Sequence, residues 1–157
     1  MLKIGKLTDY ATVILATLAN DRSRLLNAGT LAERTHIAAP TVAKLLKQLH
    51  RAGLVDSTRG TRGGYQLSRS PDAISAAAIL DALEGPIALT DCSVGSGNCC
   101  LEHSCSVSRT WQRLNAAIRR SLSEISLAQL AGLDARLPVM PIERELKHLS
   151  RPKAPAT

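Results

Sequence analysis

The chain has 157 residues and a formal net charge of +7, with 20 Lys and Arg against 13 Asp and Glu. This length fits one small domain with appendages. No apolar run reaches the length of about 18 residues that a membrane-spanning helix needs. Charged residues interrupt the first apolar stretch, so we expect no secretory signal and a cytoplasmic protein. Because Phe is absent and there are only one Trp and two Tyr, aliphatic side chains must fill the core, which favours packed helices.

The N-terminal region predicts two helices before a tight break. The first covers about residues 8–19 and is indicated by an apolar stripe at helical spacing. This stripe consists of Leu7, Ala11, Ile14, Leu15 and Leu18. A short second helix is expected to begin at Thr30, because Thr30 and Glu33 have the spacing of a capping box. Residues 35–36 then separate it from a third helix.

The third helix, over about residues 40–52, has two different faces. Pro40 suits its first position and Gly53 its stop. The inner stripe consists of Val42, Leu45, Leu46 and Leu49, and the opposite face carries Lys44, Lys47 and Arg51. A helix with an aliphatic inner face and a cationic outer face, placed after a short helix and a tight turn, is typical of the helix-turn-helix.

A β-hairpin is predicted directly after this helix. Two short extended runs, residues 53–57 and 65–67, bracket a tip that holds two arginines and three glycines. Glycine lets a backbone approach a phosphate closely, and arginine reaches into a groove. Between residues 41 and 69 there are six basic residues and one acid, so most of the net charge lies here and fits a polyphosphate partner. The basic helix followed by the hairpin predicts a winged helix.

The remaining chain predicts a fourth helix over about residues 75–84, a long helix over 109–124 and a short last helix over 127–131, capped by Ser126. The long helix has a narrow apolar seam, typical of a dimer contact, formed by Trp111, Leu114, Ile118 and Ile125. The fold class expected is therefore mostly α with a small β-hairpin wing. Its expected parts are a winged helix-turn-helix domain (1–84), a loop (85–108), a dimerisation helix with a short last helix (109–133) and a proline-rich flexible tail (134–157).

Four cysteines lie within 14 residues of the loop: Cys92, Cys99, Cys100 and Cys105. In the cytosol such crowding favours metal ligation over disulfides. Structural zinc sites show closely paired cysteines, whereas six residues separate Cys92 from Cys99 and five separate Cys99 from Cys105. Iron–sulfur clusters accept such looser spacings, so the loop favours an iron–sulfur cluster. Zinc or a thiol switch in the same loop, and a small cluster-carrier or electron-transfer protein, are the alternatives, the last disfavoured by the basic helix and hairpin.

The sequence resembles the Rrf-type winged-helix iron–sulfur transcriptional regulators. The resemblance covers about residues 1–133 and is carried by segments 6–11 (KLTDYA), 52–55 (AGLV) and 59–67 (RGTRGGYQL), together with the cysteine loop. Segments 84–86 (EGP) and 111–115 (WQRLN) are most similar to the branch that regulates a cluster-assembly operon, the SUF operon. The resemblance implies a regulator of cluster-assembly genes that senses cluster status, redox stress or nitric oxide.

The resemblance also implies a ligand set. Cys92, Cys99 and Cys105 match the three cysteines of the family motif, which makes Cys100 the surplus thiol. IscR-like members carry a histidine three residues after the last cysteine, where this chain has Ser108. NsrR-like members use an aspartate of the first helix of the other subunit, and Asp9 occupies that place. His103 and Cys100 are the local alternatives for the fourth ligand.

The apolar seam of the long helix predicts a homodimer, and a two-fold dimer bound to double-stranded DNA predicts an inverted-repeat operator. The residues expected to contact DNA are Thr41, Lys44 and Lys47 of the third helix and Arg59, Thr61, Arg62 and Gly63 of the wing. No Ser/His/Asp grouping, phosphate-binding loop or dinucleotide fingerprint occurs in the sequence, so no enzyme is expected.

Overall fold

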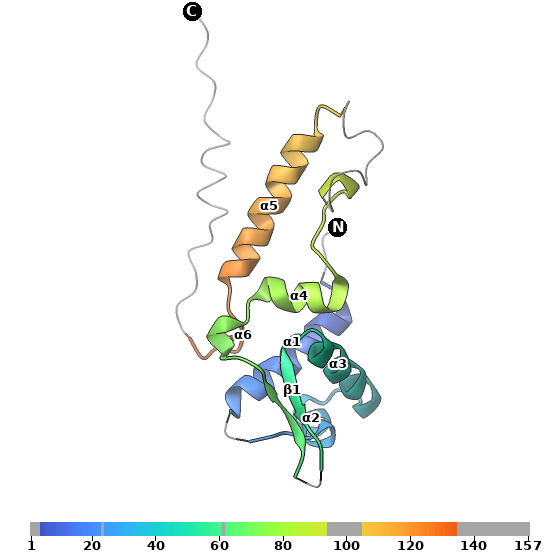
Figure 1. Cartoon of the computed structure of the whole chain (residues 1–157), viewed down its shortest axis with the longest axis vertical. Helices are drawn as coiled ribbons and strands as arrows, with labels where there is room; N and C mark the ends of the chain where they lie inside the picture. The colour runs from blue at the N-terminus through green and yellow to red at the C-terminus, as the bar shows by residue number, and fades with distance from the viewer. Residues whose placement is uncertain (1–3, 23, 61, 94–104, 135–157) are drawn as a thin grey trace, which may run out of the picture.

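The computed structural model describes residues 4–22, 24–60, 62–93 and 105–134 (Figure 1). Within these residues the elements are α1 (Lys6–Asn20), α2 (Ala28–Thr35), α3 (Ala39–Arg51), β1 (Val55–Thr58), β2 (Gly64–Leu67), η1 (Pro71–Ala73), α4 (Ala76–Glu84), η2 (Asp91–Ser93), α5 (Ser108–Glu124) and α6 (Leu127–Leu130). The predicted fold class, mostly helical with a two-stranded hairpin, is confirmed. None of the helices in these ranges is long and apolar enough to cross a membrane.

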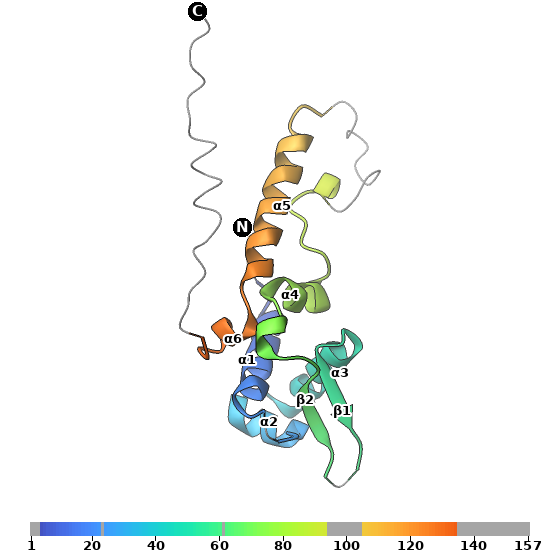
Figure 2. The same ribbon diagram turned by 60° about the vertical axis from the view of Figure 1, so that its left-hand side comes forward.

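The core lies where α1, α2, α3, α4, α6 and the hairpin meet, and aliphatic side chains fill it. Its fully buried large residues include Ile14, Leu15, Leu31, Leu45, Leu46, Leu49, Leu54, Ile74, Ile79 and Leu127. Burial of each such side chain stabilises the fold by about 1.5–3 kcal/mol. In Figures 1 and 2, α5 rises from this body as a separate arm, and the segment that ends in η2 runs beside it.

Helix α1 differs from its prediction at its first turn. It begins at Lys6 rather than near Thr8, with Gly5 as an N-cap that offers no side chain. The carboxylate of Glu84, from the end of α4, supplies the missing acceptor: it takes hydrogen bonds from the Gly5 N–H (2.7 Å) and the Thr8 hydroxyl (2.6 Å). Leu7, expected in the buried stripe, is 43% exposed because the first turn of α1 extends past the core.

The capping box expected at Thr30 is wrong. Helix α2 begins two residues earlier, and its N-cap is Asn27, whose side-chain oxygen accepts the Thr30 N–H at 2.9 Å. Asn is among the strongest N-cap residues, so it takes this position ahead of the threonine. The predicted break is confirmed, because His36 has a left-handed backbone conformation (φ 56°) that ends α2.

Helix α3 and the hairpin agree with the sequence. Pro40 lies in the first turn of α3, and the predicted inner stripe is buried. Gly53 has a φ of 68° and turns the chain into the wing. The strands β1 and β2 pair antiparallel, with Val55 opposite Leu67 and Thr58 opposite Gly64.

The C-terminal elements return the chain to the core. Ser75 caps α4, and Ser126 forms the predicted cap of α6, as a full capping box with Gln129. Backbone hydrogen bonds from Ala76 N to Ile125 O (2.8 Å) and from Leu127 N to Ile74 O (2.7 Å) join the start of α4 to the end of α5. The foot of α5 is therefore fixed to the winged helix by main-chain bonds.

Candidate nucleic-acid interface and metal centre

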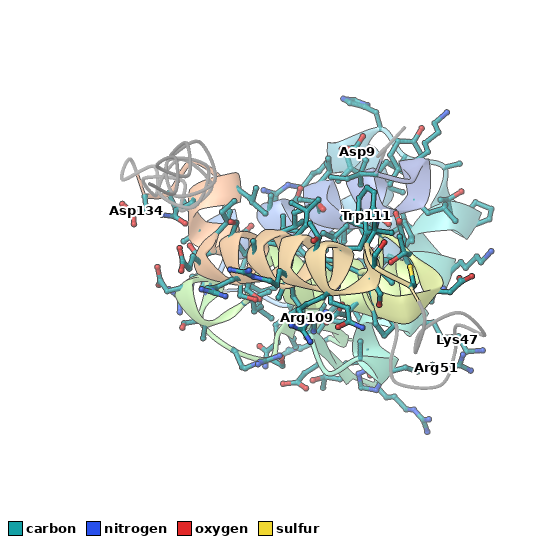
Figure 3. All side chains as sticks on the ribbon, turned by 90° about the horizontal axis from the view of Figure 1, so that it is seen from above. Asp9, Lys47, Arg51, Arg109, Trp111 and Asp134 are labelled. Atoms are coloured by element: carbon teal, nitrogen blue, oxygen red, sulfur yellow. The ribbon has the colours of Figure 1, made fainter. Side chains whose placement is uncertain are left out.

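The outer face of α3 is cationic and open to solvent. Lys44, Lys47 and Arg51 are exposed, Thr41 is half-buried, and the four aliphatic residues of the inner face are buried. Lys47 and Arg51 project from the same edge of the molecule in Figure 3. The two-faced helix predicted from sequence is thus present, and its free face has the charge that a phosphate backbone attracts.

The hairpin carries the second group of candidate DNA contacts. Arg59 and Arg62 are exposed on it, and Thr61 lies outside the described residues. Gly63 donates its N–H to the Gly60 carbonyl at 2.9 Å. A side chain at Gly63 would collide with the backbone carbonyl of Thr58, so the narrow tip requires glycine there.

Helix α3 and the hairpin are joined by short hydrogen bonds. The His50 ring nitrogen Nδ1 lies 2.9 Å from the Val55 carbonyl, and the Ser68 hydroxyl donates to the Gly53 carbonyl at 2.6 Å. At the opposite edge, Leu26 pairs with Tyr65 through two backbone bonds of 3.0 and 2.8 Å. These bonds hold the cationic helix and the arginine-bearing tip in one orientation, which a DNA-reading surface requires.

Two of the predicted cysteine ligands fall within described residues. Cys92 belongs to η2, which packs against α5. Cys105 is half-buried and precedes the first residue of α5 by three positions, and its carbonyl accepts the Ser108 N–H at 3.4 Å. Cys99, Cys100 and His103 lie outside the described residues. The two ends of the cysteine segment therefore lie at the same helix, α5.

Asp9 is exposed in the first turn of α1. Seen from above in Figure 3, it lies on the far side of α1 from the α5 of its own chain. In the ranges that the structure describes, no group of three or more His, Cys, Asp or Glu side chains converges. A complete ligand set thus does not form from the described residues of one chain.

Polar side chains attach α5 to its own protomer. Asn115, which is 7% exposed, accepts the Leu89 N–H at 3.2 Å and donates to the Ile87 carbonyl at 3.1 Å. Arg119 forms a two-bond ion pair with Asp81 of α4, at 3.0 and 2.6 Å, which raises the pKa of Arg119. Sequence reasoning missed both attachments, because each joins residues that are far apart in the chain.

The apolar seam of α5 faces outward. Trp111 and Leu114 are 42% and 40% exposed, whereas Ile118 and Ile125 are half-buried. Trp111 and Arg109 lie on opposite sides of α5 in Figure 3, with Trp111 on the side of α1. An apolar stripe of this kind on a helix that stands away from the core is the surface predicted for contact with a second chain.

A helix-turn-helix followed by an arginine-bearing hairpin defines a winged-helix DNA-binding protein. The family model of the Rrf2 regulators, described as iron-dependent transcriptional regulators, matches residues 4–132, and the chain belongs to this family. The members of this family that are similar to the chain are transcriptional regulators and not enzymes.

Three relatives illustrate the similarity. The chain is 34% identical over 132 residues to a putative HTH-type transcriptional regulator of Haemophilus influenzae, covering 83% of this chain and 87% of that protein. It is 29% identical to the HTH-type transcriptional regulator IscR of Cereibacter sphaeroides, over 87% of this chain and 90% of IscR. Among solved structures, CymR, the global cysteine regulator of B. subtilis, superposes with a TM-score of 0.68 at 32% identity, over 85% of this chain and 99% of CymR.

Proposed function

We propose that this transcriptional regulator holds an iron–sulfur cluster in its cysteine segment and uses it to control cluster-assembly genes. The observation that carries the proposal is the position of the two ends of that segment. Cys92 belongs to η2, which packs against α5, and Cys105 lies three positions before α5 begins. Thiolates are the ligands that iron–sulfur clusters prefer, so the donor set fits the group. When bound, the cluster supplies a redox-active centre that oxidants, nitric oxide or cluster shortage remove.

The residues proposed to hold the cluster are Cys92, Cys99 and Cys105, with Asp9 of a second subunit as the fourth ligand. The exposure of Asp9 and its position away from the α5 of its own chain favour a ligand supplied to a partner. Against this stands a purely structural role, since an acid in the first turn of a helix stabilises the helix dipole by about 0.3–1 kcal/mol. We expect Asp9→Asn to fold and dimerise but to lose its cluster in air faster than His103→Ala does. The opposite order would make the ligand local to one chain.

The proposed DNA contact uses two elements of each subunit. Thr41, Lys44 and Lys47 of α3 enter the major groove. The arginines of the hairpin, with Thr61 and Gly63 beside them, meet the adjacent backbone or minor groove. In a two-fold dimer, joined through the outward seam of α5, the two reading helices require an inverted-repeat operator.

The deciding experiment is native mass spectrometry of the anaerobically purified protein, combined with its visible spectrum. We expect a dimer whose added mass equals an iron–sulfur cluster on each subunit and whose solution is coloured. A colourless protein with the added mass of zinc, or with no added mass, refutes the cluster. Gel shifts with inverted-repeat DNA, before and after cluster removal, then test whether the cluster controls binding.

A thiol or zinc switch is the second candidate function. The similarity to CymR favours it, because a structure of the CymR of Staphylococcus aureus is described as an oxidized form. The two candidates differ in their response to chelation and oxidation. A thiol switch binds DNA equally well with and without iron and changes its affinity when its cysteines are oxidised, whereas a cluster sensor responds to iron removal under reducing conditions.

A further inference from the structure

The segment that leads from α4 to η2 has no helix or strand of its own between residues 85 and 90. It leaves α4 at Gly85, whose φ of 86° turns the chain, and it runs along α5 to Cys92 (Figure 2). Outside helices and strands, the position of such a segment depends on individual hydrogen bonds. Two hydrogen bonds hold the middle of this segment on α5, and both are made by Asn115.

The amide of Asn115 pairs with this segment as a second peptide group would. Its oxygen accepts from the Leu89 N–H and its nitrogen donates to the Ile87 carbonyl, two residues earlier. One side chain thus satisfies a backbone donor and a backbone acceptor, the arrangement that neighbouring strands use. Asn115 is also nearly enclosed, at 7% exposure, on a helix whose buried residues are all polar: Ser108, Asn115 and Ser121.

The anchored point lies three residues before Cys92. A chain of three residues spans at most about 10 Å, so a fixed Leu89 confines the cysteine to a small region. The turn that contains Cys92 is itself closed by two bonds between Thr90 and Ser93: Ser93 N to Thr90 O at 2.8 Å, and hydroxyl to hydroxyl at 2.9 Å. Asn115 therefore fixes the position of Leu89, and Leu89 limits the position of η2.

We propose that Asn115 is a positioning residue for the metal ligand Cys92: it fixes the 85–93 segment on α5 so that Cys92 and Cys105 are held at the same end of one helix. The role of Cys92 as a ligand rests on the proposed cluster function. The positioning rests on the two hydrogen bonds of Asn115. Asparagine suits the position because both the oxygen and the NH2 group of its amide are used. Aspartate would keep the acceptor but turn a carboxylate oxygen toward the Ile87 carbonyl, and leucine would keep the volume and lose both bonds.

The test compares Asn115→Leu with Arg119→Gln, a matched control on the same helix that removes the ion pair between α5 and Asp81 of α4 and leaves the bonds to the 85–93 segment in place. Three quantities are measured on the full chain: amide hydrogen exchange of residues 86–91, the alkylation rates of Cys92 and Cys105 by iodoacetamide in the reduced, metal-free protein, and the decay rate of the reconstituted cluster in air. Asn115→Asp is run in parallel, so that a leucine variant that fails to fold does not decide the matter.

For Asn115→Leu we expect exchange at Leu89 to rise about ten-fold, the loss of one hydrogen bond's protection. Alkylation of Cys92 should rise relative to Cys105, and the cluster should decay several-fold faster while the dimer mass stays unchanged. Arg119→Gln should change none of the three. Unchanged exchange in both Asn115 variants overturns the attachment, and faster exchange with wild-type cluster decay overturns the positioning role. A wild-type chain that takes up no cluster refutes the proposed function and the ligand role with it, while exchange still reports on the attachment.

Discussion

The contact between Glu84 and the start of α1 gives a prediction with a definite pH dependence. The Glu84 carboxylate accepts from the Gly5 N–H and the Thr8 hydroxyl and thereby caps a helix whose own N-cap has no side chain. Both bonds lower the pKa of the Glu84 carboxyl below its ordinary value, and the bond from Thr8 has the larger effect. The perturbation is Glu84→Gln, which keeps the shape and one acceptor and removes the charge.

The expected cost follows from three magnitudes. Loss of an N-cap acceptor costs about 1 kcal/mol, and a negative charge at a helix N-terminus contributes about 0.3–1 kcal/mol. Glu84 is exposed, so solvent screening puts its charge contribution at the lower end of that range. We expect Glu84→Gln to lower the free energy of unfolding by about 0.5 kcal/mol at pH 7, a fall in melting temperature of about 2 °C. Glu84→Ala, which loses the acceptor as well, should cost about 1 kcal/mol.

The sign of the pH dependence is fixed by the direction of the pKa shift. A carboxyl whose pKa is lower in the folded state stabilises the fold above its unfolded pKa, and the contribution is lost as the pH falls through the folded pKa. Glutamine does not titrate. The stability difference between wild type and Glu84→Gln should therefore be full at pH 7 and vanish in acid, below the lowered pKa. Urea denaturation over this range, with Glu33→Gln as a charge-matched control, measures it. A difference that does not decline as the solution is acidified refutes the capping role.

Three further predictions concern the DNA, the cluster and the dimer. Lys44→Ala should weaken operator binding and shift base preference, whereas Arg59→Ala should weaken all sequences equally and lower the salt slope by about one, as gel shifts at several salt concentrations will determine. Cys100→Ala should keep the visible cluster absorption and Cys99→Ala should abolish it; the reverse result would move the ligand by one residue. Ile118→Glu should give monomers in sedimentation and reduce affinity for the full operator, and a monomer that still binds it with wild-type affinity would contradict the dimer model.

Local periodicity predicted the winged-helix body well. The stripe of α3 depends only on neighbours within two turns, and its four aliphatic residues are all buried as expected. The same holds for Ser126, whose capping box is formed with a residue three positions away. Local signals can also compete. The sequence predicted Thr30 as the cap of α2, but Asn27, a stronger N-cap residue, takes that position.

The contacts that sequence could not supply are those between distant residues. Glu84 meets Gly5 across 79 positions, and Asn115 meets Ile87 across 28. Neither pair has a characteristic spacing, because the fold and not the helix period brings the partners together. Leu7 illustrates the converse: the helical period predicted it in the buried stripe of α1, but the period does not encode the depth of the core, and Leu7 is exposed. For the cysteine segment, the sequence predicted thiolates as the donors. Cys99 and Cys100 lie outside the described residues.

The inverted polarity of α5 connects these observations. A helix that only covers its own core buries its apolar stripe and exposes its polar side. In α5 the buried residues are Ser108, Asn115 and Ser121, whereas Trp111 and Leu114 are exposed. On the inner side, Asn115 binds the 85–93 segment through directional hydrogen bonds, which fix position. The outer side has the non-directional apolar surface from which association gains most. A partner packed on that surface would meet a helix whose start borders the cysteine segment and whose end is bonded to the winged-helix body, because Ile125 accepts the Ala76 N–H and Leu127 donates to the Ile74 carbonyl. Any change in the cysteine segment that reorients α5 would therefore also change the relative orientation of the two α3 helices in a dimer, because α5 connects the segment to both.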